Sequence, residues 1–399
     1  MPGRPLPTAL ERAARVSLFT AALLLGACSG SVVGPAGPGG GSVGDTPSGD
    51  TPSGDPPGIV DSTPAPLKCP DLGQVGAPVP MRRLTRRQVE RSVRDILGVD
   101  EALSASDERL STFASNISTA LDANGARAYF DFAERVSAKA QLARCTNATS
   151  CLAWLLDEVG LRLFRRPLDP DQRARYQSLY QQGGVDGARW VLAALLQSPS
   201  FLYLDEVEDE RAALDDYALA SRLSLVLWGQ NPDLALLSRA GKGELREASA
   251  LEQEAARLLA DARSQGGMQD FVDQWLDLRS LDDVDARPDL AALGRPALDA
   301  LRLEPVRFFQ RLLAQKGSLS ELLTSAESVR SDALLALYGD DIESMTNDSL
   351  KLSPARRAGI LTLPGVVAAH AHAGATSPTL RGYNVLAHFL CAPPPPPPA

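Results

Sequence analysis

The sequence is poor in the side chains that most enzymes use for catalysis and cofactor binding. It has three histidines and four methionines in 399 residues, and 5% of its residues are aromatic. No segment resembles a serine nucleophile elbow, a phosphate-binding glycine loop or a His-Glu-x-x-His helix. We therefore recognise no catalytic motif, and it stays uncertain whether the protein is an enzyme. The net charge of −9, with no basic stripe interleaved with aromatics, predicts that it binds no nucleic acid.

The first 28 residues combine a basic start with a short apolar run. Three arginines precede the apolar run at 16–25, which leads into Leu25-Gly26-Ala27-Cys28. About ten residues are too few to span a bilayer but suit a signal peptide, and no helical cap or periodicity favours a buried first helix instead. The segment resembles the lipobox of bacterial lipoproteins. This implies that residues 1–27 are a signal peptide and that Cys28 is lipidated, with palmitate among the acyl chains.

The segment after Cys28 is predicted to be a disordered tether. Residues 28–68 contain mainly Gly, Pro, Ser, Thr and Asp, so they offer too little apolar surface to offset the entropy of ordering the chain. Because Ser29 rather than Asp follows the cysteine, the lipobox resemblance implies an anchor in the outer membrane. We expect a lipid-anchored protein that faces the periplasm or the cell surface, with the membrane as its first partner.

Four cysteines remain after Cys28, an even number in an oxidising compartment. Cys145 and Cys151 are separated by the flexible, mainly polar segment Thr-Asn-Ala-Thr-Ser, which favours a local disulfide between them. Cys69 and Cys391 would then form a second disulfide, although three pairings are formally open. A metal site is the competing interpretation, but no Cys-x-x-Cys pair and no histidine at ligand spacing support it.

Helix start and stop signals recur from residue 84 onward. Thr85 and Gln88 form a capping box, Leu84 and Val89 a hydrophobic staple, and Gly98 ends the predicted helix. A second start combines Asp169 as N-cap with Pro170 and Gln172, and Asn231-Pro232-Asp233 repeats this logic. Further amphipathic runs occupy 151–164, 186–197, 214–228, 249–262, 267–278 and 296–314. Alternation of period two is nearly absent, which predicts a mainly α fold of multi-helix modules without an extended sheet.

Four groups of motifs follow one another along the chain: 84–98; Leu163-Phe-Arg-Arg-Pro-Leu168; Asn231-Pro-Asp233 with 258–263 and Phe271-Val-Asp-Gln-Trp-Leu276; and Thr376-Ser-Pro-Thr-Leu-Arg-Gly382 with the proline run 393–398. In this order they resemble the successive modules of the planctomycete-type multi-module cell-surface proteins of unknown function. We expect a first helical module at 69–150, a second at 151–208, a third at 209–345, and a truncated C-terminal module at 346–399.

The resemblance also implies a cofactor outside this chain. Complete members of the family carry a downstream Cys-x-x-Cys-His segment that looks like a c-type haem attachment site, and this sequence contains no such motif. We therefore predict no cofactor here, and haem c only in a longer form. The first functional hypothesis is the helical scaffold of an extracytoplasmic redox protein. The alternative is a non-catalytic surface module that binds a polymer or a partner protein.

The histidines are the candidate metal ligands. His370 and His372 share a face if their segment is extended, and they could then hold a metal or haem iron with help from His388. If a helix continues through them from Pro364, they point about 200° apart and cannot chelate together. The Ala/Val-rich run before them favours the helix, so we predict no metal site.

Charged clusters form the last group of candidates. Arg165 and Arg166 could bind an anionic ligand, but pairing with Asp169 or Asp171, or capping of carbonyls at a helix end, is favoured. Arg381 has the same interpretations, and a role as a clamp between modules is equally expected. Asp270, Asp273 and Asp277 lie on one side of the predicted helix over 267–278. A glycosidase pair of carboxylates is the sharper interpretation, whereas a solvated face opposite a buried stripe of Phe271, Trp275 and Leu278 is favoured.

Overall fold

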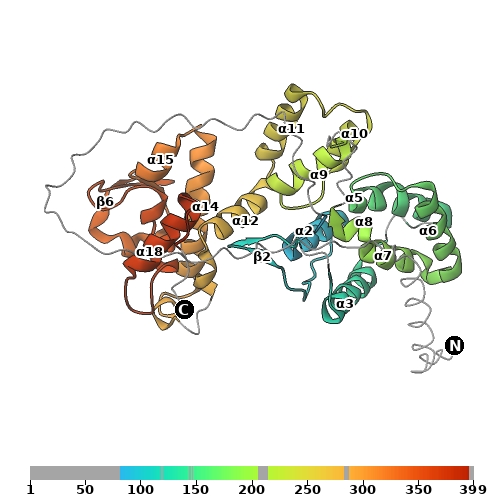
Figure 1. Ribbon diagram of the computed structural model, residues 1–399, viewed down its shortest axis with the longest axis horizontal. Coiled ribbons are helices and arrows are strands. Elements are labelled where there is room, and N and C mark those ends of the chain that lie inside the picture. The colour runs from blue at the N-terminus through green and yellow to red at the C-terminus, as the bar shows by residue number, and fades with distance from the viewer. Residues whose placement is uncertain are drawn as a thin grey trace, which may run out of the picture. The chain divides into compact units, whose positions relative to one another are not determined.

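The computed structural model describes residues 81–394 except 118–119, 143–144, 146, 205–213 and 283–286. The predicted signal peptide, tether, Cys28 and Cys69 lie outside these residues. Within them the chain is mainly α-helical, as predicted, with three sheets of two or three short strands (Figure 1).

The part up to residue 204 consists of helices and two small antiparallel strand pairs. Strand β1 pairs with β4, and β2 pairs with β3 as a hairpin. The elements are β1 (Arg82–Arg83), α2 (Arg86–Leu97), β2 (Arg109–Leu110), β3 (Phe113–Ala114), α3 (Ala123–Lys139), α4 (Ala148–Trp154), a π-helical segment (Leu155–Gly160), α5 (Leu161–Phe164), α6 (Pro170–Gly183), a 3₁₀ turn (Gly184–Asp186), α7 (Gly187–Gln197), α8 (Pro199–Leu202) and β4 (Tyr203–Leu204).

The part from residue 214 adds more helices and a three-stranded antiparallel sheet in the order β5-β7-β6. Its helices are α9 (Asp216–Leu227), α10 (Leu234–Gly241), α11 (Ala248–Ala260), α12 (Ser264–Trp275), α13 (Pro288–Ala291), α14 (Arg295–Ala314), α15 (Leu319–Thr324), α16 (Leu335–Tyr338), α17 (Pro364–Ala369) and α18 (Pro378–Asn384). Its strands are β5 (Glu327–Val329), β6 (Ile342–Met345) and β7 (Ser349–Leu352). Its 3₁₀ and π segments are Leu278–Asp282, Asp332–Leu334, Gly339–Asp341, Ile360–Thr362 and Val385–Phe389.

The predicted helix ends are confirmed. The Thr85–Gln88 capping box begins α2, and Gly98 ends it in the left-handed conformation at φ 67°. Asp169 caps α6 through the backbone N–H of Gln172. Asp233 caps α10. These signals are local in sequence, so they are readable without knowledge of the tertiary fold.

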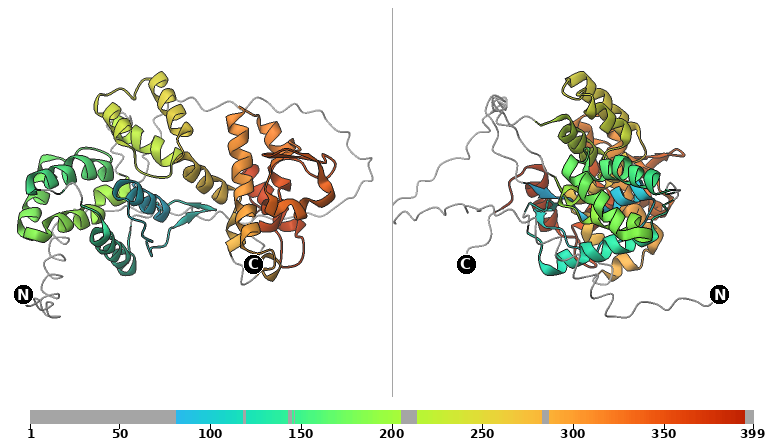
Figure 2. Two further views of the ribbon diagram at one scale, coloured as in Figure 1. Left: turned by 180° about the vertical axis from the view of Figure 1, so that it is seen from behind. Right: turned by 90° about the vertical axis from the view of Figure 1, so that its right-hand side faces the viewer.

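Helix α3 and the sheet β5-β7-β6 are among the elements that were not predicted. Helix α3 begins at its N-cap Asp122, whose side chain accepts a hydrogen bond from the backbone N–H of Gly125. The sheet β5-β7-β6 lies beside α14, as the left view of Figure 2 shows. Its strands are three or four residues long, too short for alternation to be seen against the surrounding sequence.

The buried apolar residues form three clusters. We call the first the N-terminal core, which comprises the buried side chains of 84–204 together with Leu225. The C-terminal core comprises those between Val272 and Ala369. A smaller third cluster surrounds Trp228 between α9, α10 and α11. Helix α12 contacts α9 on one side and α14 on the other, so it connects the third cluster with the C-terminal core.

A proline inside α14 allows close packing in the C-terminal core. Pro305 has no N–H, so it cannot donate the helical hydrogen bond to the carbonyl oxygen of Leu301. Helix α17 approaches that oxygen at Gly365, where a Cβ atom would lie 1.9 Å from it. Only glycine fits this approach, which fixes α17, and the segment of His370 after it, against α14.

Candidate functional site

Arg165 is a buried cap for the carbonyl groups of its own chain. The residue ends α5 in the left-handed conformation (φ 61°), and 4% of it is exposed. Its guanidinium donates to four backbone carbonyl oxygens, those of Leu163, Ser200, Phe201 and Tyr203, at 2.7–3.1 Å. The favoured interpretation of this arginine, carbonyl capping at a helix end, is confirmed.

The Asn231-Pro232-Asp233 motif connects helices that are distant in sequence. The side-chain amide of Asn231 donates to the carbonyl oxygens of Arg162 and Leu163, and its backbone N–H donates to Ser92 Oγ. Asp233 both caps α10 and pairs with Arg257. Burial raises the pKa of Asp233, but the hydrogen bonds from Arg257 and from the first turn of α10 outweigh burial and lower it.

The other two arginine candidates, Arg166 and Arg381, are less buried than Arg165. Arg166 pairs with Asp215 at 3.1 Å, not with Asp169 or Asp171 as predicted, and both partners are about 40% exposed. Arg381 is half-buried in α18, and the structure shows no hydrogen bond from its side chain to another described residue.

The predicted solvated face of the acidic helix is wrong. Asp273 is 2% exposed and accepts from Arg302 at 2.9 Å, whereas Phe271 is 41% exposed. Asp270 accepts from Arg87 and Arg91 of α2. The prediction failed because these arginines lie far away in sequence, and because α12 ends at Trp275, before Leu278.

The acidic pair joins α2, α12 and α14 rather than forming a glycosidase pair of carboxylates. Burial raises the pKa of Asp273, with the opposing charges of Arg302 and Arg87 acting against it. One of its oxygens, Oδ1, is buried without a hydrogen-bond partner among the described residues. Asp277, the third acid, lies outside α12 and pairs with Arg279.

The three histidines are held in different ways. Helix α17 ends at Ala369, so the helix predicted to continue through His370 and His372 stops before them. His370 is buried, and its Nε2 lies 2.9 Å from the carbonyl oxygen of Leu276. Burial lowers its pKa. His372 forms an isolated bridge with Ala375, and His388 lies on the π-helical segment. Among the described residues no group of three or more His, Cys, Asp or Glu side chains is arranged to hold a metal ion.

Glu304 is a buried acid that the sequence analysis did not identify. It is 2% exposed in the C-terminal core, and its Oε1 accepts hydrogen bonds from Ser328 Oγ at 2.8 Å and from the Tyr338 hydroxyl. Burial raises its pKa to about 7, and the two hydrogen bonds act against that shift. The residue lies at an ordinary helical position of α14, so no sequence pattern marks it.

Five aromatic side chains gather where β3, α12, α14 and the π-helical segment at 385–389 meet. Adjacent ring centroids are 4.8–6.2 Å apart. The residues are Phe113, Phe271, Trp275, Phe309 and Phe389. The hairpin is held against α12 because the backbone N–H of Ala114 donates to Gln274 Oε1 at 2.7 Å. This cluster was also missed, since four separate segments contribute to it.

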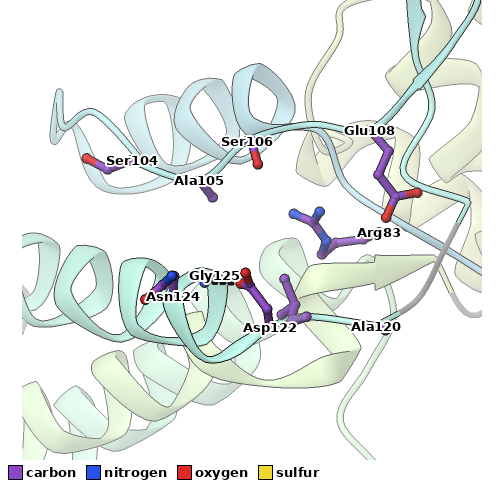
Figure 3. A pocket seen from close by; sticks show the side chains of 10 residues that line it. Arg83, Ser104, Ala105, Ser106, Glu108, Ala120, Asp122, Asn124 and Gly125 are labelled. Atoms are coloured by element: carbon purple, nitrogen blue, oxygen red, sulfur yellow. Dashed lines mark hydrogen bonds between the residues drawn. The ribbon is translucent and has the colours of Figure 1, made fainter.

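A polar cavity of about 360 Å³ opens beside Arg83. Figure 3 shows the guanidinium of Arg83 directed into it, with Ser106 and Glu108 above and Asp122 and Asn124 below. Arg83 is 4% exposed. One of its terminal nitrogens donates to the Tyr129 hydroxyl, and its Nε is buried without a hydrogen-bond partner among the described residues. No motif marks these positions, and the sequence analysis missed them.

The walls of this cavity are held by hydrogen bonds from buried groups. Asn116 is fully buried, and its side chain accepts from the backbone N–H of Glu108 and donates to Asp107. Asp107 in turn accepts from the backbone N–H of Arg86. On the opposite wall Asp122 caps α3. The loop before β2 and the start of α3 are therefore fixed on either side of Arg83.

Of the predicted disulfides, the Cys145–Cys151 bond is confirmed. Cys391 is exposed and unpaired among the described residues, and Cys69 lies outside them, so the second bond stays a prediction. The predicted lipidation of Cys28 and the module boundaries also stay predictions. None of the described helices is long and apolar enough to cross a membrane.

Four family models match successive parts of the chain. Residues 82–141 match the family model DUF1587, and residues 151–206 match the family model DUF1595, both described as proteins of unknown function. Residues 214–339 match DUF1592, and residues 357–399 match DUF1588, both also of unknown function. Neither the curated proteins nor the solved structures contain a match.

Proposed function

We propose, because this chain belongs to the planctomycete-type multi-module family of unknown function, that it is an outer-membrane-anchored envelope protein whose helical body is a non-catalytic binding module. The anchor is the lipidated Cys28, and the tether after it separates the body from the membrane. The body binds a polymer or a partner protein of the envelope.

The observation that carries the binding function is the cavity at Arg83. Its walls are fixed by buried hydrogen bonds, and a guanidinium projects into it, so polar groups are positioned in advance for a ligand. Preorganised, concave sites with a few convergent polar groups are typical of ligand binding. The other charged candidates, Arg165 and Asp273, are instead used to hold the protein's own chain together.

The anchor and the binding function are tested together on cell fractions. We expect the wild-type chain in the outer membrane with the mass of the lipidated form, and the Cys28→Ser variant as an unlipidated precursor. Washed envelopes of a strain that lacks the gene should retain residues 69–399, which carry no lipidation site, in a sedimentation assay. Mature mass and membrane association of the Cys28→Ser variant would refute the anchor. Turnover of an ester, peptide or glycoside substrate would refute the non-catalytic function.

The aromatic cluster favours a second candidate, the scaffold of a redox protein. Its rings lie close to one another in space, and they include Phe389, which is near the end of the described residues. The family resemblance implies a haem segment downstream of this position. A haem stain of the product of the whole gene, including any codons beyond Ala399, tests it. A stained product supports a redox role, and an unstained one leaves the binding module as the function.

A further inference from the structure

We propose that the cavity at Arg83 binds the C-terminal carboxylate of a partner protein. This inference names the partner chemistry of the proposed binding function, a polypeptide rather than another polymer, and it rests on that function. Three features support it: a buried guanidinium with unused donors, the first turn of a long helix, and a lining with a single cation.

The guanidinium of Arg83 has donors that the protein does not use. Arg83 is 4% exposed, and one of its terminal nitrogens donates to the Tyr129 hydroxyl at 2.5 Å. Its Nε is buried without a hydrogen-bond partner, and its second terminal nitrogen has no acceptor among the described residues. Figure 3 shows the guanidinium directed into the cavity. A carboxylate would satisfy these donors in a charge-assisted pair, which a buried cation needs.

The first turn of α3 lines the same cavity. The helix is 17 residues long, and Asn124 and Gly125 of its first turn are among the lining residues. The N-terminus of a helix attracts an anion through its dipole and through backbone N–H groups that have no acceptor inside the helix. An anionic group in the cavity is therefore attracted both by Arg83 and by α3.

The two acidic residues of the lining have roles within the protein. Asp122 caps α3 by accepting from the backbone N–H of Gly125, and Glu108 also has an interaction inside the protein. We assign no group of the ligand to either carboxylate. The binding of the anion is assigned to Arg83 and to the first turn of α3.

The lining favours the end of a polypeptide over an acidic polysaccharide. Arg83 is the only cation among the described lining residues, and the net charge of −9 would repel a polymer that carries a carboxylate on every unit. None of these lining residues is aromatic, so a sugar ring finds no stacking surface. Ala105 and Leu121 offer apolar contacts, and 360 Å³ is at the small end of the range for ligand sites. The cavity thus matches one charge and one small side chain, as at the end of a protein chain.

The test measures peptide binding to the full chain extracted in detergent, by calorimetry. The four probes are acetyl-trialanine with a free C-terminal carboxylate, the same peptide as C-terminal amide, an amidated peptide with one central aspartate, and trigalacturonate. We expect the free-carboxylate peptide to bind at least about tenfold more tightly than each of the others. The proposal is overturned if any of these binds as tightly, or if the free-carboxylate peptide shows no binding at millimolar concentration.

Variants at Ser106 test the charge of the ligand. Ser106 is exposed and lines the cavity, so its replacement leaves Arg83 and its contacts in place. Ser106→Asp should weaken binding of the free-carboxylate peptide about tenfold, and Ser106→Lys should tighten it. Weaker binding in both variants would indicate a steric effect and contradict an anionic ligand. Arg83→Gln should abolish binding, and if this variant fails to fold, the two Ser106 variants decide the question.

A matched control lies in a second cavity. Thr149 is exposed and lines a cavity between α4 and α6. Thr149→Asp adds the same charge there and should leave peptide binding unchanged, whereas a loss equal to that of Ser106→Asp would refute the site. The envelope sedimentation assay separates this proposal from the wider one. Envelope retention without peptide binding refutes the ligand alone, and peptide binding without envelope retention refutes the envelope function alone.

Discussion

The N-terminal core and the C-terminal core each contain a buried ionisable side chain, Arg165 in the first and Glu304 in the second, and the two are stabilised differently. In the N-terminal core the Arg165 guanidinium meets four backbone carbonyl oxygens. In the C-terminal core Glu304 accepts two hydrogen bonds at its Oε1, and its Oε2 is buried without a partner among the described residues. Arginine cannot lose its proton in a protein, so it must be given acceptors. A carboxyl group can instead be buried by taking up a proton.

From this contrast we expect Glu304 to make the stability of the C-terminal core depend on pH near neutrality, whereas Arg165 has no such effect on the N-terminal core. The guanidinium of Arg165 keeps its charge and its partners throughout. Glu304 changes from neutral to charged near pH 7, inside a core where the positive charge of Arg357, whose side chain lies over the Tyr338 ring, acts against the rise in its pKa. The sharpest tests of the contrast therefore change one of these groups at a time and follow the free energy of unfolding.

Replacement of Arg165 should have the largest effect. Arg165→Met leaves four buried carbonyl oxygens without their donors, and we expect the free energy of unfolding to fall by about 4 kcal/mol. Urea unfolding followed by circular dichroism measures this. The control is Arg166→Met, which removes an exposed pair with Asp215 and should cost less than about 1 kcal/mol. Similar losses for the two variants would show that burial of Arg165 is not what stabilises this region.

The pH dependence of the C-terminal core should be the next largest effect. The pKa of Glu304 is about 7 in the folded protein against 4.5 for the free group. Because the folded state holds the proton more tightly, its contribution to stability is complete below pH 4.5 and is lost as the pH rises to about 7. The loss corresponds to about 3 kcal/mol.

Glu304→Gln isolates this contribution, because glutamine keeps the shape and cannot ionise. We expect the difference in free energy of unfolding between the wild type and this variant to change by about 3 kcal/mol between pH 4.5 and 7.5, in the direction that disfavours the wild type at high pH. His370, whose lowered pKa has the opposite effect in this range, is present in both proteins and cancels. A constant difference across the range would refute the raised pKa.

Asp273 tests the ion cluster that links α12 to both neighbouring helices. Asp273→Asn removes the buried negative charge between Arg302 and Arg87, and we expect a loss of about 2 kcal/mol. Asp282 is the second partner of Arg302 and is 56% exposed, so Asp282→Asn should cost less than about 1 kcal/mol. If thermal unfolding gives the two variants equal stability, the buried pair does not hold the helices together.

The sequence predicted local structure far better than it predicted partners between distant segments. Thr85 and Asp169 were identified as caps because the backbone N–H groups that they bind lie three residues away. The carbonyl-capping role of Arg165 was also predicted, since its position at a helix end was visible. The acceptors at Ser200, Phe201 and Tyr203 were not, because nothing in the local pattern indicates which segment will pass beside α5.

The errors have the same physical origin. Asp273 was assigned to a solvated face because an acidic residue on a helix is exposed unless a partner neutralises it, and Arg302 lies 29 residues away. The cavity at Arg83 was missed because it is made by β1, the loop before β2 and the start of α3. The cap Asp122 and Gly125 could have indicated α3, and with it one wall of the cavity, from sequence alone.

The smallest predicted effect tests whether the two cores differ only in their buried charges. Each region contains an exposed capping box, Asp169 with Gln172 in α6 and Ser318 with Glu321 in α15. Since both caps satisfy the same backbone N–H group, Asp169→Ala and Ser318→Ala should each lower the free energy of unfolding by about 1 kcal/mol. Thermal unfolding at pH 5 and pH 7.5 measures both. If each variant loses the same free energy of unfolding at both pH values, the different pH dependence of the two cores is due to Arg165 and Glu304. A loss for only one of the two variants would show that its region unfolds separately from the other.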